Sequence, residues 1–172
     1  MNCAGWSEDE TSSAERLFCE AVFREFDYDP ESGAFTRRSN GASAYLVHKP
    51  SRYYRCYFQG KIFQAHRLVF MWMTGRFPFG CIDHKDVDPT NNRWENLREA
   101  TKSQNGANVL RGRHNTSGVK GVSRHSQNNN WVVHIGVRGR VMHVGSFSDL
   151  ETARAAYADA SLRYFGEFAR SA

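Results

Sequence analysis

Residues 81–105 concentrate side chains that can take part in phosphate chemistry. Asp83 and His84 are adjacent, and a loop rich in Asp, Pro and Asn follows them. The oxygens of Asp83 and Asn105 are hard ligands for one divalent cation, Mg²⁺ or Mn²⁺. With only two ligands from the protein, the cation keeps room for water and for a phosphate oxygen. An imidazole such as that of His84 can take a proton from an attacking water. The segment therefore predicts metal-assisted hydrolysis of a phosphate ester.

Three short elements are expected to bring these side chains together. A strand at Gly80–Asp83 ends at the Asp-His pair, and Leu97–Ala100 forms the return strand. Thr101 and Gln104 have the spacing of a capping box, so a helix starts there and places Asn105 in its first turn. For an isolated Asp-His pair, the alternative is a capped turn with a solvated histidine. The complete arrangement on a basic chain favours the chemical interpretation.

The charge of the chain points to a polyanionic partner. Residues 1–50 carry a net charge of −4 and residues 51–172 carry +9, which gives +5 for the whole chain. The stretch Ala100–Ser148 holds seven Lys/Arg and four His but no acid. An acid on a phosphate-facing surface would repel its partner, so we expect double-stranded DNA to bind here, rather than a basic loop that binds nothing.

The motifs of the segment are Asp83-His84, Asn92-Arg93-x-Glu95-Asn96-Leu97-Arg98 and Thr101-x-x-Gln104-Asn105-x-x-Asn108, with His66-Arg67-Leu68-Val69 upstream. They resemble the HNH nucleases of the phage homing-endonuclease type. The resemblance implies that His84 is the general base and that Asn96 orders the loop and holds His84 in place. It also implies that Asp83 and Asn105 bind the metal, with an Asn where many of these nucleases have a His. Losing that nitrogen donor makes zinc less suitable. We interpret His66 as packing or as a helix start.

A second module of three strands and one helix is predicted for residues 117–172. The strand-like runs are Val119–Arg124, Trp131–Val137 and Val141–Phe147, and a helix follows from about Asp149, with a capping box at Ser148, to Phe165. Alternate residues of the second run, from Trp131 to Val137, are apolar and should face the helix. The opposite face then carries Asn130, Val132 and His134.

The pattern Gly118-x-Lys-Gly121-Val122, the strand end Val144-Gly-x-Phe147 and the Ala-rich helix resemble the plant ethylene-response-factor (APETALA-type) DNA-binding domain. That resemblance implies that the uncovered face of the sheet enters the major groove. The predicted DNA-binding residues are Arg111, Arg113, Lys120, Arg124, Asn130, His134, Arg138, Arg140 and His143.

The predicted fold class is α+β, in four parts. Residues 1–50 form an acidic segment with a helix from a capping box at Ser12 to about Phe26, a turn over Asp27–Gly33 and a strand at Ala34–Arg37. Residues 51–110 form the HNH (ββα-metal) nuclease domain, including a hairpin around Gln59-Gly60-Lys61 and a helix over His66–Thr74. Residues 111–116 form a basic linker, and residues 117–172 form the three-stranded antiparallel sheet packed on one helix.

Several classes of protein are excluded or disfavoured. No apolar run approaches the ~20 residues of a membrane helix, and the N-terminus has no secretory pattern. The four cysteines stand far apart without a CxxC pair, which favours reduced thiols over a zinc site. We therefore expect a cytoplasmic protein, in the host cell if it is phage-encoded, with a monomer slightly favoured.

The function predicted from the sequence is a metal-dependent DNA endonuclease of the homing or site-specific nicking type. The catalytic residues are His84, Asn96 and Asn105, and the metal ligands are Asp83 and Asn105. A DNA-binding regulator with an idle nuclease centre is the alternative. If the second module serves only to target the first, a chain that ends at residue 116 should remain a weak, poorly targeted nuclease.

Overall fold

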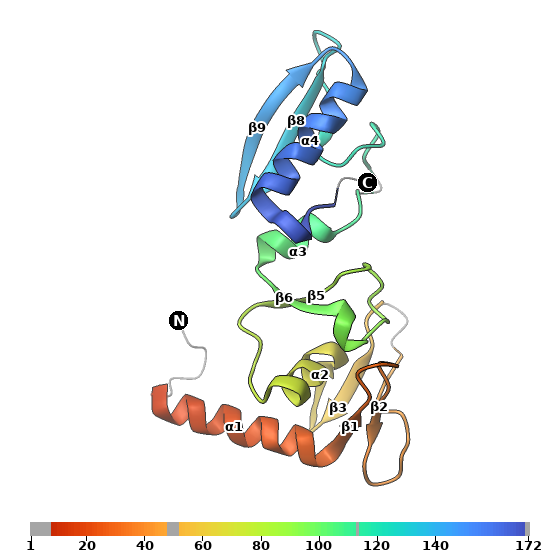
Figure 1. Cartoon of the computed structure of the whole chain (residues 1–172), viewed down its shortest axis with the longest axis vertical. Coiled ribbons are helices and arrows are strands. Elements are labelled where there is room, and N and C mark those ends of the chain that lie inside the picture. The colour runs from red at the N-terminus through yellow and green to blue at the C-terminus, as the bar shows by residue number, and fades with distance from the viewer. Residues whose placement is uncertain (1–7, 48–51, 113, 171–172) are drawn as a thin grey trace. The chain divides into compact units, whose positions relative to one another are not determined.

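The computed structural model describes residues 8–47, 52–112 and 114–170, with the backbone alone over residues 8–12. The chain forms two compact units, Met1–Glu99 and Ala100–Ala172 (Figure 1). The sequence gives the first unit 13 Lys/Arg and 14 Asp/Glu, and the second 10 and 4, so the second carries the net positive charge. Four helices and several small sheets agree with the α+β prediction.

The first unit alternates short strands with two helices. Its elements are α1 (Glu8–Glu25), β1 (Phe26–Tyr28), β2 (Phe35–Arg37), β3 (Arg55–Phe58), β4 (Lys61–Gln64), α2 (Ala65–Thr74), β5 (Cys81–His84), the 3₁₀ turn η1 (Trp94–Asn96) and β6 (Leu97–Ala100). The strands pair as β1-β2, β3-β4 and β5-β6. The predicted hairpin is confirmed, with Gln59 and Gly60 both at positive φ in its two-residue turn. The end of α2 is confirmed as well, at Gly75 in the left-handed conformation.

Two predictions for the N-terminal segment were wrong. The first helix begins at Glu8, so the capping box at Ser12 lies inside it. The turn predicted over Asp27–Gly33 is shorter, because residues 26–28 form β1 and pair with β2. A strand of three residues carries too little periodic signal to be seen in the sequence.

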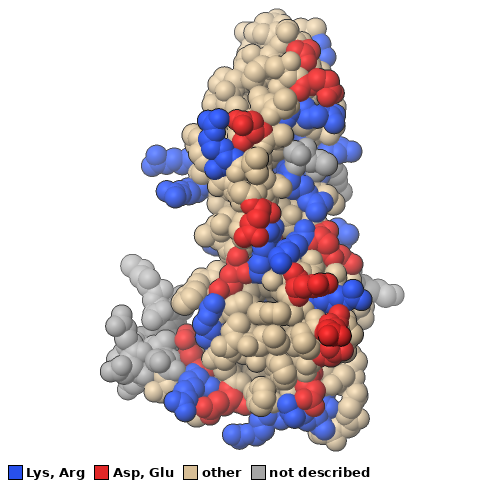
Figure 2. All heavy atoms as spheres, viewed as in Figure 1, with Lys and Arg blue, Asp and Glu red and all other residues tan. Residues whose placement is uncertain are grey.

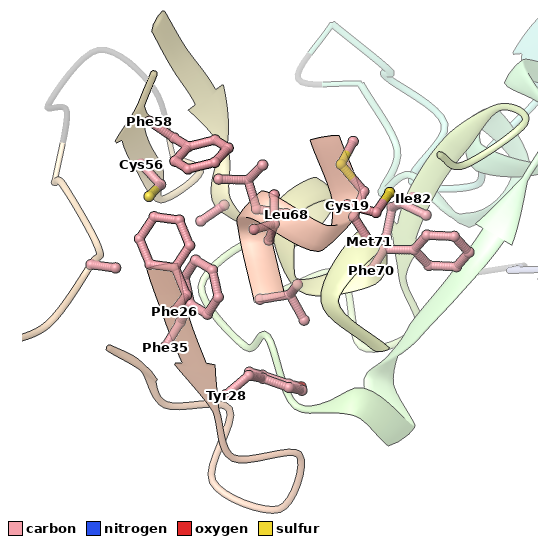
Figure 3. Close-up of a cluster of buried hydrophobic side chains, with 14 of the residues drawn as sticks. Cys19, Phe26, Tyr28, Phe35, Cys56, Phe58, Leu68, Phe70, Met71 and Ile82 are labelled. Carbon is pink, nitrogen blue, oxygen red and sulfur yellow. The ribbon is translucent and has the colours of Figure 1, made fainter. Parts of the chain in front are cut away.

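The N-terminal segment contributes to the same hydrophobic core as the rest of the first unit. Figure 3 shows the buried cluster that joins α1, β1, β2, β3, α2 and β5. Phe26 and Phe35 are fully buried and stack with their ring centroids 4.6 Å apart. Burial of one such side chain stabilises a fold by about 1.5–3 kcal/mol. Residues 8–47 are therefore part of the scaffold that carries β5 and β6.

The second unit contains the three-stranded sheet that the sequence predicts. Its elements are α3 (Lys102–Asn108), β7 (Val122–Arg124), β8 (Trp131–Val137), β9 (Arg140–Phe147), α4 (Leu150–Phe165) and the 3₁₀ turn η2 (Gly166–Phe168). The strand order is β7-β8-β9, antiparallel throughout, and α4 packs on β8 and β9. The N-cap of α4 is Asp149, whose side chain accepts a hydrogen bond from the Thr152 amide, and not the predicted Ser148.

Helix α3 belongs to the second unit. Ala100 and Ala107 are buried in one core with Val133 and Tyr157. The compact units therefore divide at Glu99, upstream of the helix that carries Asn105, whereas the predicted nuclease domain runs on to residue 110.

None of the described helices has the length and apolar composition needed to cross a membrane. Three cysteines lie in the described part of the chain, Cys19, Cys56 and Cys81, and all three are free thiols. Burial raises the pKa of the Cys56 thiol to about 11, so this thiol stays protonated and packs as an apolar group.

Candidate active site

The Asp-His pair lies at the end of β5 and is buried. Asp83 and His84 are each 4% exposed. Buried polar side chains of this kind need partners, because an unpaired polar group in the interior costs free energy. The partners of these two residues define the candidate site.

His84 is held by Asn92, a residue of the loop motif for which the sequence predicted no role. Nε2 of His84 lies 3.0 Å from Oδ1 of Asn92, which is itself only 2% exposed. The amide oxygen of Asn92 accepts a hydrogen bond from this nitrogen when Nε2 carries the ring proton. The prediction that Asn96 holds His84 is corrected, because the contact belongs to Asn92.

Asn96 orders the loop through an aspartate. Its Oδ1 accepts from the Asp86 amide at 3.0 Å, and its Nδ2 donates to Oδ1 of Asp86 at 2.9 Å and to the Asn91 carbonyl at 2.8 Å. Burial alone would raise the pKa of Asp86, but hydrogen bonds from Asn91, the Asp88 amide and Asn96 lower it. Asp86 is therefore a charged centre for the loop after β5, and Asn96 performs the loop-ordering part of its predicted role.

The N-terminal segment supports Asn92 from the other side. The Tyr28 hydroxyl donates to the Asn92 carbonyl at 2.7 Å, and the Trp94 amide donates to the Pro30 carbonyl at 3.1 Å. Gly33 lies so close that a Cβ built on it would be 2.8 Å from the Arg93 nitrogen, and its φ is +76°. The turn between β1 and β2 thus presses directly against the backbone that positions His84.

This close approach gives a testable expectation for Gly33→Ala. The substitution combines a strained positive φ with a backbone clash, so it should lower the free energy of unfolding by about 2–4 kcal/mol. Gly41→Ala is the matched control, because Gly41 also has a positive φ of 67° but a Cβ on it would meet no described atom within 4 Å. Urea unfolding of the two variants measures the difference. Equal losses would show that the contact with residues 92–93 carries no energy.

Asp83 is engaged by an arginine. Nε of Arg98, on β6, donates to Oδ2 of Asp83 at 2.9 Å, and the two side chains are 12% and 5% exposed. A buried carboxylate next to a buried guanidinium is a strongly coupled pair. The carboxylate of the predicted metal ligand is thus already matched with one positive charge.

His66 packs against the candidate base. It is 3% exposed, its ring centroid is 5.1 Å from that of His84, and its Nδ1 has no hydrogen-bond partner among the described residues. Burial, followed by the charges of His84 and Arg67, lowers the pKa of His66 to about 3. His66 is therefore neutral at physiological pH, which agrees with the packing interpretation.

The lowered pKa of His66 predicts acid sensitivity. An unfolded chain protonates His66 near pH 6.5, but the folded chain does so only near pH 3, so stability falls as the pH drops through this window. Between pH 7 and pH 4 this single group should cost about 3 kcal/mol. Urea unfolding of the wild type and of His66→Leu at both pH values measures it. If the variant lost as much stability on acidification as the wild type, His66 would not be the cause.

Asn105 lies in the second unit, in the first turn of α3. The capping box predicted for this helix is confirmed, with Thr101 and Gln104 bonded reciprocally. Asn105 is half-buried, and its side-chain amide forms no hydrogen bond with any described residue.

Carboxylate and amide oxygens, such as those of Asp83 and Asn105, are donor types that a hard divalent cation takes. No group of three or more His, Cys, Asp or Glu side chains that could hold a metal occurs in the part of the chain that the structure describes.

The open face of the sheet is polar, with few formal charges. Val133 and Ile135 are buried against α4, as predicted. On the other face His134 pairs with His143 across the strands, with ring centroids 5.3 Å apart. Asn130 precedes β8 with the same parity. The acids of this unit all belong to α4, its cap or η2, and Figure 2, seen from the side of α4, shows them mixed with basic side chains.

Two of the predicted DNA-binding residues do not lie on the open face of the sheet. Arg124 pairs with Trp131 and stacks on its ring at 4.7 Å, so it lies on the side of the sheet that faces the helix. Lys120 donates three hydrogen bonds to backbone carbonyls at the end of α3. Burial, together with the charge of Arg170, lowers the pKa of Lys120 to about 8. The prediction that Lys120 contacts DNA is corrected, since its ammonium is already used inside the unit.

The other predicted arginines that the structure describes lie at the hairpin tip and beside α4. Arg138 and Arg140 flank Gly139 at the tip of the β8–β9 hairpin, and both are exposed. Arg111 lines a groove of about 470 Å³ beside α4, together with Glu151 and Arg154. Arg113 lies outside the described residues.

Comparison with known families gives one match. Residues 63–107, about a quarter of the chain, match the family model of the HNH endonuclease. No curated protein and no solved structure matches the chain. The matched segment contains Asp83, His84, Asn92, Asn96 and Asn105, and it continues from the first compact unit into α3 of the second. The match supports a nuclease that acts on DNA.

Proposed function

We propose that the chain is a metal-dependent DNA endonuclease whose HNH segment hydrolyses one phosphodiester bond in duplex DNA. The observation that carries the proposal is the buried His84, oriented by Asn92, inside the segment that matches the HNH family. An imidazole whose ring is held by a buried amide is oriented for proton transfer in a way that a solvated histidine is not.

The proposed step begins with proton abstraction from water. In the tautomer in which Nε2 of His84 donates to Asn92, the nitrogen that takes the proton from water is Nδ1. His66 excludes water from one side of the ring without adding charge, since it is neutral. Hydrogen bonds between Asn96 and Asp86 order the loop that runs from His84 to η1.

Asp83 and Asn105 are the residues that would hold Mg²⁺ or Mn²⁺. A cation held there would stabilise negative charge on the scissile phosphate and on the leaving oxygen. Arg98 fixes the orientation of the Asp83 carboxylate through its hydrogen bond. In this proposal Asn105 supplies a neutral ligand from the start of α3.

The second unit is proposed to bind duplex DNA, in the manner of an ethylene-response-factor domain. Its net positive charge and its acid-free stretch through β9 support the proposal. The residues that fit this role are Asn130, His134 and His143 on the open face, with Arg138 and Arg140 at the hairpin tip and Arg111 beside α4. One HNH centre cuts one strand, so a monomer would nick at a specific site, as in a phage-type homing or nicking enzyme.

A second candidate is a DNA-binding regulator whose centre is idle. The ion pair between Asp83 and Arg98 favours it, because a cation must compete with a guanidinium for that carboxylate. A plasmid assay separates the two candidates. The full chain should convert supercoiled DNA to the relaxed form with Mg²⁺ or Mn²⁺ and not with EDTA, whereas a regulator would bind DNA and leave it supercoiled.

A further inference from the structure

We propose that Lys120 is a positioning residue of the nuclease centre, because it fixes the end of the helix that carries Asn105. The inference rests on the proposed function. It concerns a residue outside the segment that matches the HNH family, in the module that the sequence assigns to DNA targeting.

The contacts of Lys120 form a complete cap. Its Nζ donates to the carbonyl oxygens of Gly106, Ala107 and Val109 at 2.9, 2.6 and 2.7 Å. An ammonium has three protons, and here each has one acceptor. The last carbonyls of a helix have no amide partner within the helix, and positive charge at this end is favourable. Since α3 has no basic residue in its own last turn, Lys120 supplies that charge from outside the helix.

The rest of α3 is also held by the second unit. The Ser103 hydroxyl accepts a hydrogen bond from the Arg138 amide at 2.9 Å. Ala107 is buried in the core that contains Val133 and Tyr157. Residues of α3 line a cavity of about 430 Å³ together with Lys120 and Arg140. Every turn of the helix therefore contacts the sheet, its hairpin or the segment before β7.

A helix as short as α3 depends on such contacts. It has seven residues, and isolated helices below about 12–15 residues are marginal in water. Its N-terminal capping box is local, but its C-terminal cap comes from Lys120. The conformation of Asn105, one residue before the first of the three capped carbonyls, is thus set largely by the second unit.

The consequence is that the second unit does more than target DNA. If it positions a metal ligand, a chain that ends at residue 116 loses the cap, the hydrogen bond to Ser103 and most of the core around Ala107. Such a chain should have no nuclease activity. If the second module served only to target the first, the shortened chain would instead keep weak activity.

The test compares Lys120→Met with Arg163→Met in the full chain. Both remove one positive charge from the second unit, but Arg163 is an exposed residue of α4 whose partner is Asp159. Single-turnover nicking at saturating DNA, DNA affinity as a function of salt, and amide exchange over Lys102–Asn108 are measured for each.

We expect Lys120→Met to lower the nicking rate by about 10- to 100-fold and to speed exchange in α3, with affinity and its salt slope unchanged. Lys120→Arg, which keeps the charge and the donors, should recover part of the rate. Arg163→Met should behave as the wild type in nicking. An unchanged rate, or a weaker affinity with a shallower salt slope, would overturn the inference, the latter because it marks a phosphate contact.

Two further outcomes are decisive. If Lys120→Met does not fold, the test uses Lys120→Arg instead. A wild-type nicking rate in a variant whose α3 amides exchange faster would then overturn the inference. If the wild type itself does not nick, the proposed function fails. The exchange measurement then still decides whether Lys120 holds α3, so the two failures are distinguishable.

Discussion

His84→Ala should lower the single-turnover rate of DNA nicking by about 10²- to 10⁴-fold, the range that a general base contributes. Affinity for DNA should change by less than about twofold, because His84 is buried and does not belong to the exposed surface that would contact phosphate. Asn92→Ala should lower the rate less, since it keeps the base but releases its orientation. Rates at saturating DNA and binding curves, measured on the same preparations, separate the two effects.

His125→Ala is the matched control for this experiment. His125 is an exposed histidine of the second unit, so its removal should leave the nicking rate unchanged. If His84→Ala reduced binding and nicking by the same factor, His84 would be part of the scaffold and not the base. Unchanged nicking in His84→Ala would remove it from the mechanism altogether.

Asp83→Ala should affect stability and activity through separate causes. It leaves the Arg98 guanidinium buried without its carboxylate, which should lower the free energy of unfolding by about 3–5 kcal/mol. It also removes the proposed carboxylate ligand, so nicking should be lost. Urea unfolding and nicking assays measure the two consequences independently.

The double variant Asp83→Ala/Arg98→Met separates the causes. The double variant no longer buries an unpaired Arg98 guanidinium, so most of the lost free energy of unfolding should return. Nicking should not return, because the ligand is still missing. A double variant that nicks would show that Asp83 matters only as the partner of Arg98, and a double variant as unstable as Asp83→Ala would show that the ion pair is not the source of the loss.

Local patterns were sufficient to predict much of the scaffold. The turn at Gln59-Gly60, the end of α2 at Gly75 and the capping box at Thr101 each depend on a few neighbouring residues, and all three are confirmed. Strand β8 was predicted from the alternation of apolar residues over seven positions, and β9 from the strand-like run Val141–Phe147. Features that depend only on neighbouring residues can be predicted from the sequence.

The contacts that complete the site depend on residues far away in the chain. Asn92 is held by Tyr28 and crowded by Gly33, about 60 positions earlier, and no local pattern connects them. The same limit explains why the contact with His84 was assigned to Asn96. A buried residue in an Asn-rich loop can be recognised as polar and structured, but its partner cannot be selected from spacing alone.

The basic residues of the second unit show a different limit. Charge counts predicted a polyanion-binding surface, but they carry no information on side-chain direction. Arg124 stacks on Trp131 and Lys120 caps α3, so neither projects from the open face of the sheet. A long cationic side chain serves equally well as a helix cap, a stacking partner or a phosphate contact, and only its neighbours in space decide among these roles.

The central claim is that the HNH segment of this chain cuts DNA, and plasmid relaxation by the full chain tests it most directly. Supercoiled DNA, including the DNA that flanks its own gene, is incubated with the protein and Mg²⁺, Mn²⁺ or EDTA. We predict conversion to the nicked circle with either metal, none with EDTA, and none with His84→Ala in the presence of metal. Binding without metal-dependent nicking on any of these substrates would contradict the claim and leave a DNA-binding protein with an idle centre.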